Sequence, residues 1–106
     1  MKAGVVRARN DIRYEDIERP TPKPGEVLIK VKYTGICGSD VPRVNGDAAH
    51  FYPIVLGHEF SGTVEEVNNG AKGLRVGDRV AGIPLEPCME CDDCKKGDFS
   101  LCKHYV

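Results

Sequence analysis

The sequence predicts a mostly β domain: a small barrel of short strands with irregular loops and a zinc-binding lobe. Three observations support this class. The strong secondary-structure signals are all of the β type, glycine is abundant at 12 residues while tryptophan is absent, and four cysteines crowd one polar, turn-rich segment. Short strands separated by turns are typical of small antiparallel barrels and sandwiches. The length of 106 residues suits one domain, residues 1–106, with a core of modest size.

The first two strands are predicted to form a hairpin. Residues 2–8 are apolar and β-branched, residues 12–17 alternate imperfectly, and Asn10 and Asp11 between them favour a turn. Residues 19–25 are rich in proline and therefore predict a loop, because proline interrupts both helices and strands.

The third strand, at 26–32, has the clearest pattern. One of its faces carries Val27, Ile29 and Val31. This period of two predicts a half-buried strand. Further strands are predicted at 60–67 and 78–83, separated by a turn that begins at Asn68.

Helical signals are short. One helical turn is predicted to begin at Ser39 or Asp40 and to end at Asn45, and Pro42 fits its first turn because proline lacks only an N–H that has no helical partner there. A second turn is predicted at 92–97. The candidate metal ligands therefore lie mostly on loops and strand ends, as functional residues usually do.

The charge and the cysteine content limit the partners. The net charge of −1 implies no general attraction to nucleic acid. No apolar run approaches membrane-spanning length, so no membrane partner is expected. The first residues lack a secretory signal, and reduced, metal-binding cysteines point to the cytoplasm.

Four cysteines with the spacing C-x2-C-x2-C-x7-C form the strongest motif. They are Cys88, Cys91, Cys94 and Cys102. Four thiolates complete the tetrahedral shell of a closed, structural zinc site. Two disulfides are the alternative in a short secreted chain, but the missing signal and an odd fifth cysteine favour zinc.

A second, smaller set of metal-ligand residue types is Cys37, His58 and Glu59. Cys37 follows the third strand and His58 precedes the next, so the two meet if those strands are neighbours. An open, catalytic zinc site needs three protein ligands and an exchangeable position. Glu59 is a possible third ligand, and Asp40 could accept the second imidazole N–H of His58. The alternative is a buried cysteine and an ordinary surface His-Glu pair.

The motifs resemble those of the zinc-dependent medium-chain alcohol and polyol dehydrogenases. The matching segments run through 35–40, 53–62 and 76–80 into the four-cysteine lobe, and together they span essentially the whole chain. The resemblance implies a GroES-like fold and the N-terminal part of the catalytic domain. It also implies NAD as cofactor, zinc at a catalytic and a structural site, oxidation of a secondary alcohol to a ketone, a small-molecule polyol or polyol phosphate as substrate, and a homo-oligomer, a dimer or a tetramer.

The resemblance assigns a role to each site residue. It implies that Cys37 and His58 bind the catalytic zinc, while Glu59 contacts it through water or transiently. Ser39 would take the proton of the substrate hydroxyl, and Asp40 would orient the histidine. The implied structural ligands are Cys88, Cys91, Cys94 and Cys102. Alcohol dehydrogenase is itself a known example of the open zinc site.

Four departures from the family pattern are present. The chain has no Gly-x-Gly-x-x-Gly fingerprint for a dinucleotide, and it contains no match for the remaining protein ligand of the catalytic zinc, a later Cys or Glu. Pro42 stands at the position of the usual relay histidine, and Asn68 replaces a common glycine. These 106 residues are therefore expected to be part of a longer dehydrogenase and to be inactive alone.

Two segments, 37–43 and 49–53, resemble most those members of the family that oxidise a hexitol phosphate. Arg43 and His50 flank the expected site and could meet a phosphate, since arginine offers a bidentate fork to its oxygens. Alternatively, Arg43 is a solvated charge and His50 a packed loop residue. Three alternatives for the function remain. The chain could belong to a dehydrogenase of sorbitol, threonine or butanediol, it could be a non-catalytic binding module stabilised by zinc, or it could be a co-chaperonin.

Overall fold

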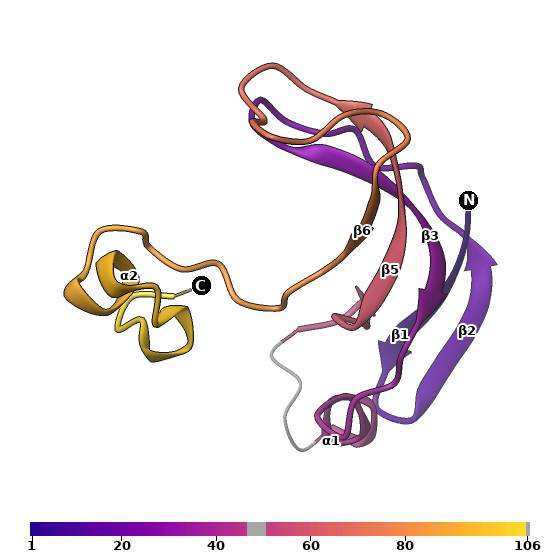
Figure 1. Ribbon diagram of the computed structural model, residues 1–106. Helices are drawn as coiled ribbons and strands as arrows, with labels where there is room; N and C mark the ends of the chain where they lie inside the picture. Colours follow the sequence, from indigo (N-terminus) through magenta and orange to yellow (C-terminus); the bar gives the residue numbers. More distant parts are fainter. Residues whose placement is uncertain (47–50, 106) are drawn as a thin grey trace.

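A computed structural model describes residues 1–46 and 51–105 (Figure 1). The predicted hairpin is confirmed: β1 (Lys2–Ala8) pairs with β2 (Asp11–Asp16) in antiparallel fashion. Asn10 adopts the left-handed conformation between them (φ 59°), which asparagine tolerates better than most residues. A two-residue strand, β4 (Ile54–Val55), pairs with the other edge of β1. β4 was not predicted, because two residues are too few to show periodicity.

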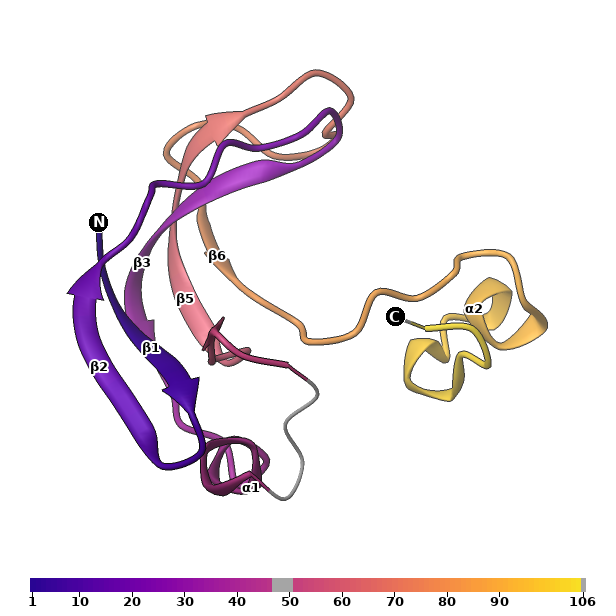
Figure 2. The same ribbon diagram turned by 180° about the vertical axis from the view of Figure 1, so that it is seen from behind.

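The second sheet has the order β3-β5-β6 and is also antiparallel. It contains β3 (Val27–Thr34), β5 (Phe60–Val67) and β6 (Arg79–Ala81). The strand predicted at 78–83 is thus present but shorter. The mostly β class is confirmed, and the curved strands pair within two separate three-stranded sheets (Figures 1 and 2).

The pairing of β3 with β5 positions the candidate open site. Thr34, the last residue of β3, is opposite Phe60, the first residue of β5. The ladder continues one step further, since the N–H of Gly35 donates to the carbonyl of Glu59 at 2.7 Å. The segments that carry Cys37 and His58 therefore leave the sheet at the same end.

The buried core is small and lies on the first strand and on β5. Val6 and Val64 are 2% and 1% exposed, and Val5 is also buried. Of the three apolar residues predicted on one face of β3, two are half-buried but Val31 is 54% exposed. The register of β3 shifts just after Val31, and such an irregularity locally turns the strand, so the alternation does not predict burial there.

The predicted helical turn is α1 (Asp40–Asn45), which begins after Ser39 and ends at Gly46 in the left-handed conformation (φ 96°). The hairpin turn supports its C-terminal end, because the N–H of Asn10 donates to the carbonyl of Val44 at 2.8 Å. In the part of the chain that the structure describes, no helix has the length and apolarity needed to cross a membrane.

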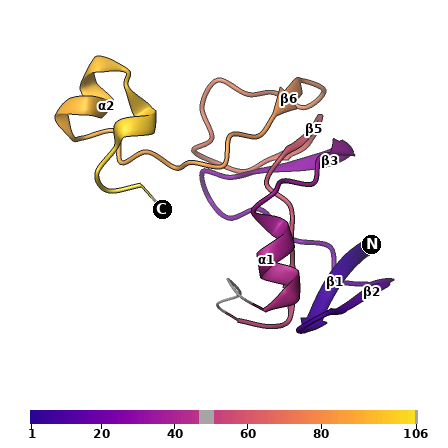
Figure 3. The same cartoon turned by 90° about the horizontal axis from the view of Figure 1, so that it is seen from below.

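The four cysteines lie in a separate lobe. Its two short helices are α2 (Asp92–Lys96), as predicted, and the 3-10 helix η1 (Phe99–Leu101). The lobe stands apart from both sheets in all three views and is joined to β6 by an extended segment (Figures 1 to 3). The radius of gyration is accordingly 15.7 Å, whereas a compact domain of this length has about 13 Å.

Candidate metal centres

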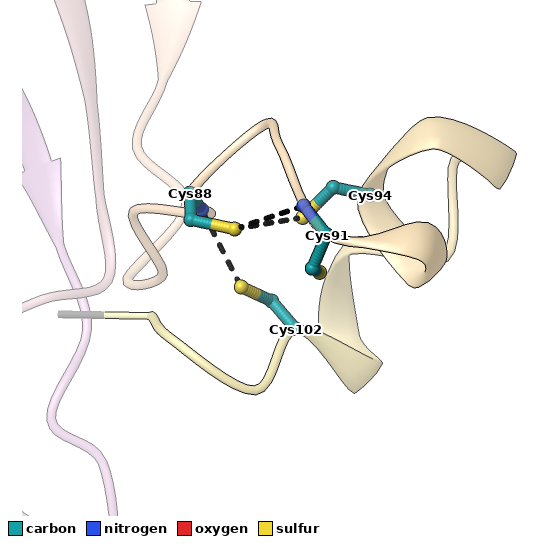
Figure 4. A group of neighbouring side chains, drawn as sticks. All are labelled: Cys88, Cys91, Cys94 and Cys102. Carbon is teal, nitrogen blue, oxygen red and sulfur yellow. Dashed lines mark hydrogen bonds between the residues drawn. The ribbon is translucent and has the colours of Figure 1, made fainter.

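The four cysteines of the lobe converge on one point (Figure 4). Their Sγ atoms all lie within 4.8 Å of one another. Cys88 Sγ and Cys94 Sγ are 3.9 Å apart. The edge of a zinc–thiolate tetrahedron is about 3.8 Å for a Zn–S bond of about 2.3 Å, whereas a disulfide measures about 2.05 Å. All the cysteines are free, so the lobe has the geometry of a closed zinc site and not of two disulfides.

Backbone amides hold the sulfur atoms in place. The N–H of Cys91 donates to Cys88 Sγ, and the N–H groups of Cys88 and His104 donate to Cys102 Sγ, each at 3.4 Å. Hydrogen bonds to a thiolate favour the charged form of the ligand. The chain around the cysteines is thus folded to present four thiolates to a cation.

The environment separates the pKa values of neighbouring thiols. Hydrogen bonding to the backbone amide of Cys94 lowers the pKa of the Cys91 thiol to about 6. Burial raises the pKa of the Cys94 thiol to about 12, and this residue is 5% exposed. A buried thiol beside other thiolates ionises readily only when a cation compensates the charge, and a zinc ion supplies that charge. The donor set therefore fits zinc.

The second set, Cys37, His58 and Glu59, also converges. One potential ligand atom of each lies within 4.8 Å of the others. Cys37 follows β3 and the other two directly precede β5, so the predicted meeting of two strand ends is confirmed. Cys37 and His58 are half-buried, while Glu59 is exposed. Three donors suit an open metal site with a fourth position left for water or substrate.

Asp40 lies directly behind this group and is 6% exposed. Its Oδ2 accepts a hydrogen bond from the N–H of Cys37 at 3.0 Å. Its Oδ1 is 3.6 Å from His58 Nδ1, which is longer than the predicted hydrogen bond. This oxygen is buried without a hydrogen-bond partner in the described part of the chain. A buried carboxylate oxygen without a partner is costly, and a small rotation of the His58 ring toward Asp40 would satisfy it.

The structure shows fewer side-chain contacts for the remaining predicted residues. Ser39 is exposed at the start of α1 and its side chain does not cap the helix. Arg43 is half-buried on α1, and its guanidinium has no hydrogen bond or ion pair to a residue within 1–46 or 51–105. His50, predicted near the substrate, lies outside the described residues.

One residue beside the site was not predicted. The hydroxyl of Thr34 donates to the carbonyl of Glu59 at 3.2 Å. It thereby anchors the residue that follows His58. No sequence signal identifies it, because a threonine at a strand end is common and its partner lies 25 positions further along the chain.

The chain is similar to known proteins over nearly its whole length. Residues 23–106 match the family model of the alcohol dehydrogenase GroES-like domain. Galactitol 1-phosphate 5-dehydrogenase of Escherichia coli K12 is 50% identical over 106 residues, which cover 96% of this chain and 28% of that protein. Sorbitol dehydrogenase of Bombyx mori is 46% identical, covering 94% of this chain and 30% of that protein.

The solved structures agree as well. The crystal structure of galactitol-1-phosphate dehydrogenase from Escherichia coli matches with a TM-score of 0.87 and 42% identity, over 99% of this chain and 31% of that one. The chain thus spans about three tenths of the length of the relatives it matches. The matched family model covers the open metal-ligand set and the four-cysteine lobe alike, and the chain belongs to the alcohol dehydrogenase GroES-like domain family.

Proposed function

We propose that residues 1–106 form the N-terminal, zinc-binding part of the catalytic domain of an NAD-dependent polyol dehydrogenase. The proposed reaction is the oxidation of a secondary alcohol to a ketone, with galactitol 1-phosphate as substrate and tagatose 6-phosphate as product. The observation that carries the proposal is the convergence of Cys37, His58 and Glu59 at one end of the β3–β5 pair, beside a separate closed lobe. The relatives named galactitol 1-phosphate and sorbitol dehydrogenase support the polyol class.

The residues of the open site would act together. Cys37 and His58 would hold a zinc ion, with Glu59 as a third or water-mediated contact. Zinc, when bound, polarises an alcohol oxygen and lowers its pKa toward neutrality. Ser39, exposed beside the site, would accept the proton of the substrate hydroxyl. Asp40 fixes the backbone of Cys37 through Oδ2 and faces the His58 ring through Oδ1.

Substitution of Asp40 tests whether the open site binds metal. The lobe is first saturated with zinc, and the protein is then titrated with Co²⁺. A second ion should bind with lower affinity, and the absorption of the Co²⁺–thiolate bond measures its binding. Asp40→Ala should weaken this second binding by about ten- to a hundredfold, because residues behind the ligands orient them. Lack of any ion beyond the one in the lobe, in the longer dehydrogenase that carries this domain, would contradict the proposal.

Asp78→Ala is the matched control for Asp40→Ala. Asp78 Oδ2 accepts the N–H of Arg75 at 2.8 Å, and its own N–H donates to the carbonyl of Arg75. Asp40 makes the same pair of contacts with Cys37, also three residues earlier. Asp78→Ala should therefore remove an equivalent turn contact and leave the binding of the second ion unchanged.

The substrate is tested by Arg43→Ala in the dehydrogenase that carries this domain. A guanidinium beside the site would favour a phosphorylated hexitol, and a charge-assisted contact contributes about 1.5–3 kcal/mol, or roughly ten- to a hundredfold. Arg43→Ala should lower kcat/KM for galactitol 1-phosphate by that factor and leave an unphosphorylated hexitol almost unaffected. Arg75→Ala, which changes an exposed arginine of the loop between β5 and β6, is the control.

A neutral polyol is the second candidate substrate. The identity with a sorbitol dehydrogenase, 46%, is almost as high as that with the galactitol 1-phosphate enzyme. If Arg43→Ala lowered kcat/KM equally for both substrates, this arginine would have a purely structural role. A wild type that prefers the neutral hexitol would establish the second candidate. The cytoplasmic location and the homo-oligomer stay predictions.

A further inference from the structure

The side chain of Glu59 lies over the α-carbon of Gly35. A Cβ placed on Gly35 would be 2.5 Å from Glu59 Oε2 and 3.2 Å from Glu59 Cβ. Real Cβ atoms do not approach other atoms to 2.5 Å, so the carboxylate occupies the space that any other residue at position 35 would fill. The two residues are also joined by the hydrogen bond from the Gly35 N–H to the Glu59 carbonyl, 2.7 Å.

We propose that Gly35 is a positioning residue for the open metal site: its missing side chain lets the Glu59 carboxylate lie beside Cys37 and His58. The inference rests on the proposed function of that site. The carboxylate has no hydrogen bond or ion pair to a residue of the described ranges, and it packs against Gly35. Cys37 lies two residues after Gly35. One short segment therefore supplies one candidate ligand and leaves the space that the carboxylate of Glu59 occupies.

Backbone conformation does not require glycine at this position. Gly35 is absent from the glycines with positive φ, so alanine can adopt its backbone without strain. The nearest obstacle to a Cβ is the far end of a flexible side chain, which can rotate away at little cost. The Cβ of Glu59, at 3.2 Å, needs to shift by only a few tenths of an ångström. Gly35→Ala should therefore leave the fold intact and displace chiefly the carboxylate.

Gly38→Ala is the matched control. Gly38 lies in the same loop, it also lacks a positive φ, and a Cβ there would meet no atom within 4 Å. Both variants add one methyl group three residues apart. They differ in whether that methyl group meets Glu59.

The test is a Co²⁺ titration of the full chain with its lobe saturated by zinc, and Cys37→Ser identifies the signal of the open site. Gly35→Ala should weaken Co²⁺ binding by about ten- to a hundredfold, as expected when a group that orients a metal site is lost. Gly38→Ala should bind Co²⁺ as the wild type does. In a Glu59→Ala background, Gly35→Ala should cause no further loss, because the displaced carboxylate is already gone.

Three results would overturn the inference. They are wild-type affinity in Gly35→Ala, an undiminished loss of affinity when Gly35→Ala is added to Glu59→Ala, and failure of Gly35→Ala to fold. A wild type that binds no Co²⁺ at Cys37 contradicts the proposed function instead. In that case, crystal structures of the wild type and Gly35→Ala decide: a displaced Glu59 carboxylate supports the role of Gly35, and an unmoved one refutes it.

Discussion

Cys94→Ser is expected to release the tightly bound zinc and to unfold the lobe, while both sheets keep their structure. Apart from Cys94 and Cys102, no residue of the lobe within its described part, 84–105, is buried, and Phe99 and Leu101 are 43% and 63% exposed. The lobe therefore has almost no apolar core. Structural zinc contributes about 10–16 kcal/mol to folding in small zinc domains, and a missing thiolate forfeits much of it.

Elemental analysis and amide hydrogen exchange measure the two effects. Cys94→Ser should lose the tight zinc, and the amides of residues 88–102 should exchange freely while those of β3 and β5 stay protected. Cys37→Ser is the matched control, because it removes a thiolate from the open set and should retain the tight zinc. If Cys37→Ser lost more zinc than Cys94→Ser, the closed and the open site would be reversed.

A polypeptide of these 106 residues, supplied with NAD and a polyol, is expected to produce no NADH. No two glycines of the sequence are separated by a single residue, so the dinucleotide fingerprint Gly-x-Gly-x-x-Gly is missing from it. Hydride transfer needs the nicotinamide held against the carbinol carbon, and such positioning contributes about 7–11 kcal/mol to lowering the barrier.

Absorbance at the NADH band under steady-state conditions tests this expectation. The control is the same sequence within the longer dehydrogenase that carries it, which should show activity that depends on Cys37. Sustained NADH formation by the 106 residues alone would show that they bind the cofactor themselves. The expectation that another part of the dehydrogenase binds NAD would then be wrong.

The sequence predicts those features that depend on neighbouring residues. The strands β1, β2, β3 and β5 follow from alternation and turn formers, and the cysteine spacing predicts a convergence of sulfur atoms that the structure contains. The open set is harder to predict, because Cys37 and His58 are brought together only by strand pairing.

Features that depend on long-range geometry could not be predicted. The predicted burial of Val31 is wrong, because a register shift turns β3 at that point. The distance between Asp40 and His58 depends on how α1 meets the sheet end, and the resemblance indicated the pair but not the gap of 3.6 Å. The space over Gly35 is visible only once the Glu59 side chain is in place.

The separation of the lobe from the sheets has a consequence for the order of folding. The four ligands of the lobe lie between Cys88 and Cys102, whereas Val27 pairs with Val67 and Val5 pairs with Val55. Loop-closure entropy and folding time both rise with the sequence separation of the contacts, so the lobe, like the β1–β2 hairpin, is a low-contact-order part of the chain. Its maturation should therefore depend on the supply of zinc rather than on assembly of the sheets. Under zinc limitation, chains with folded strands and an unfolded lobe should accumulate.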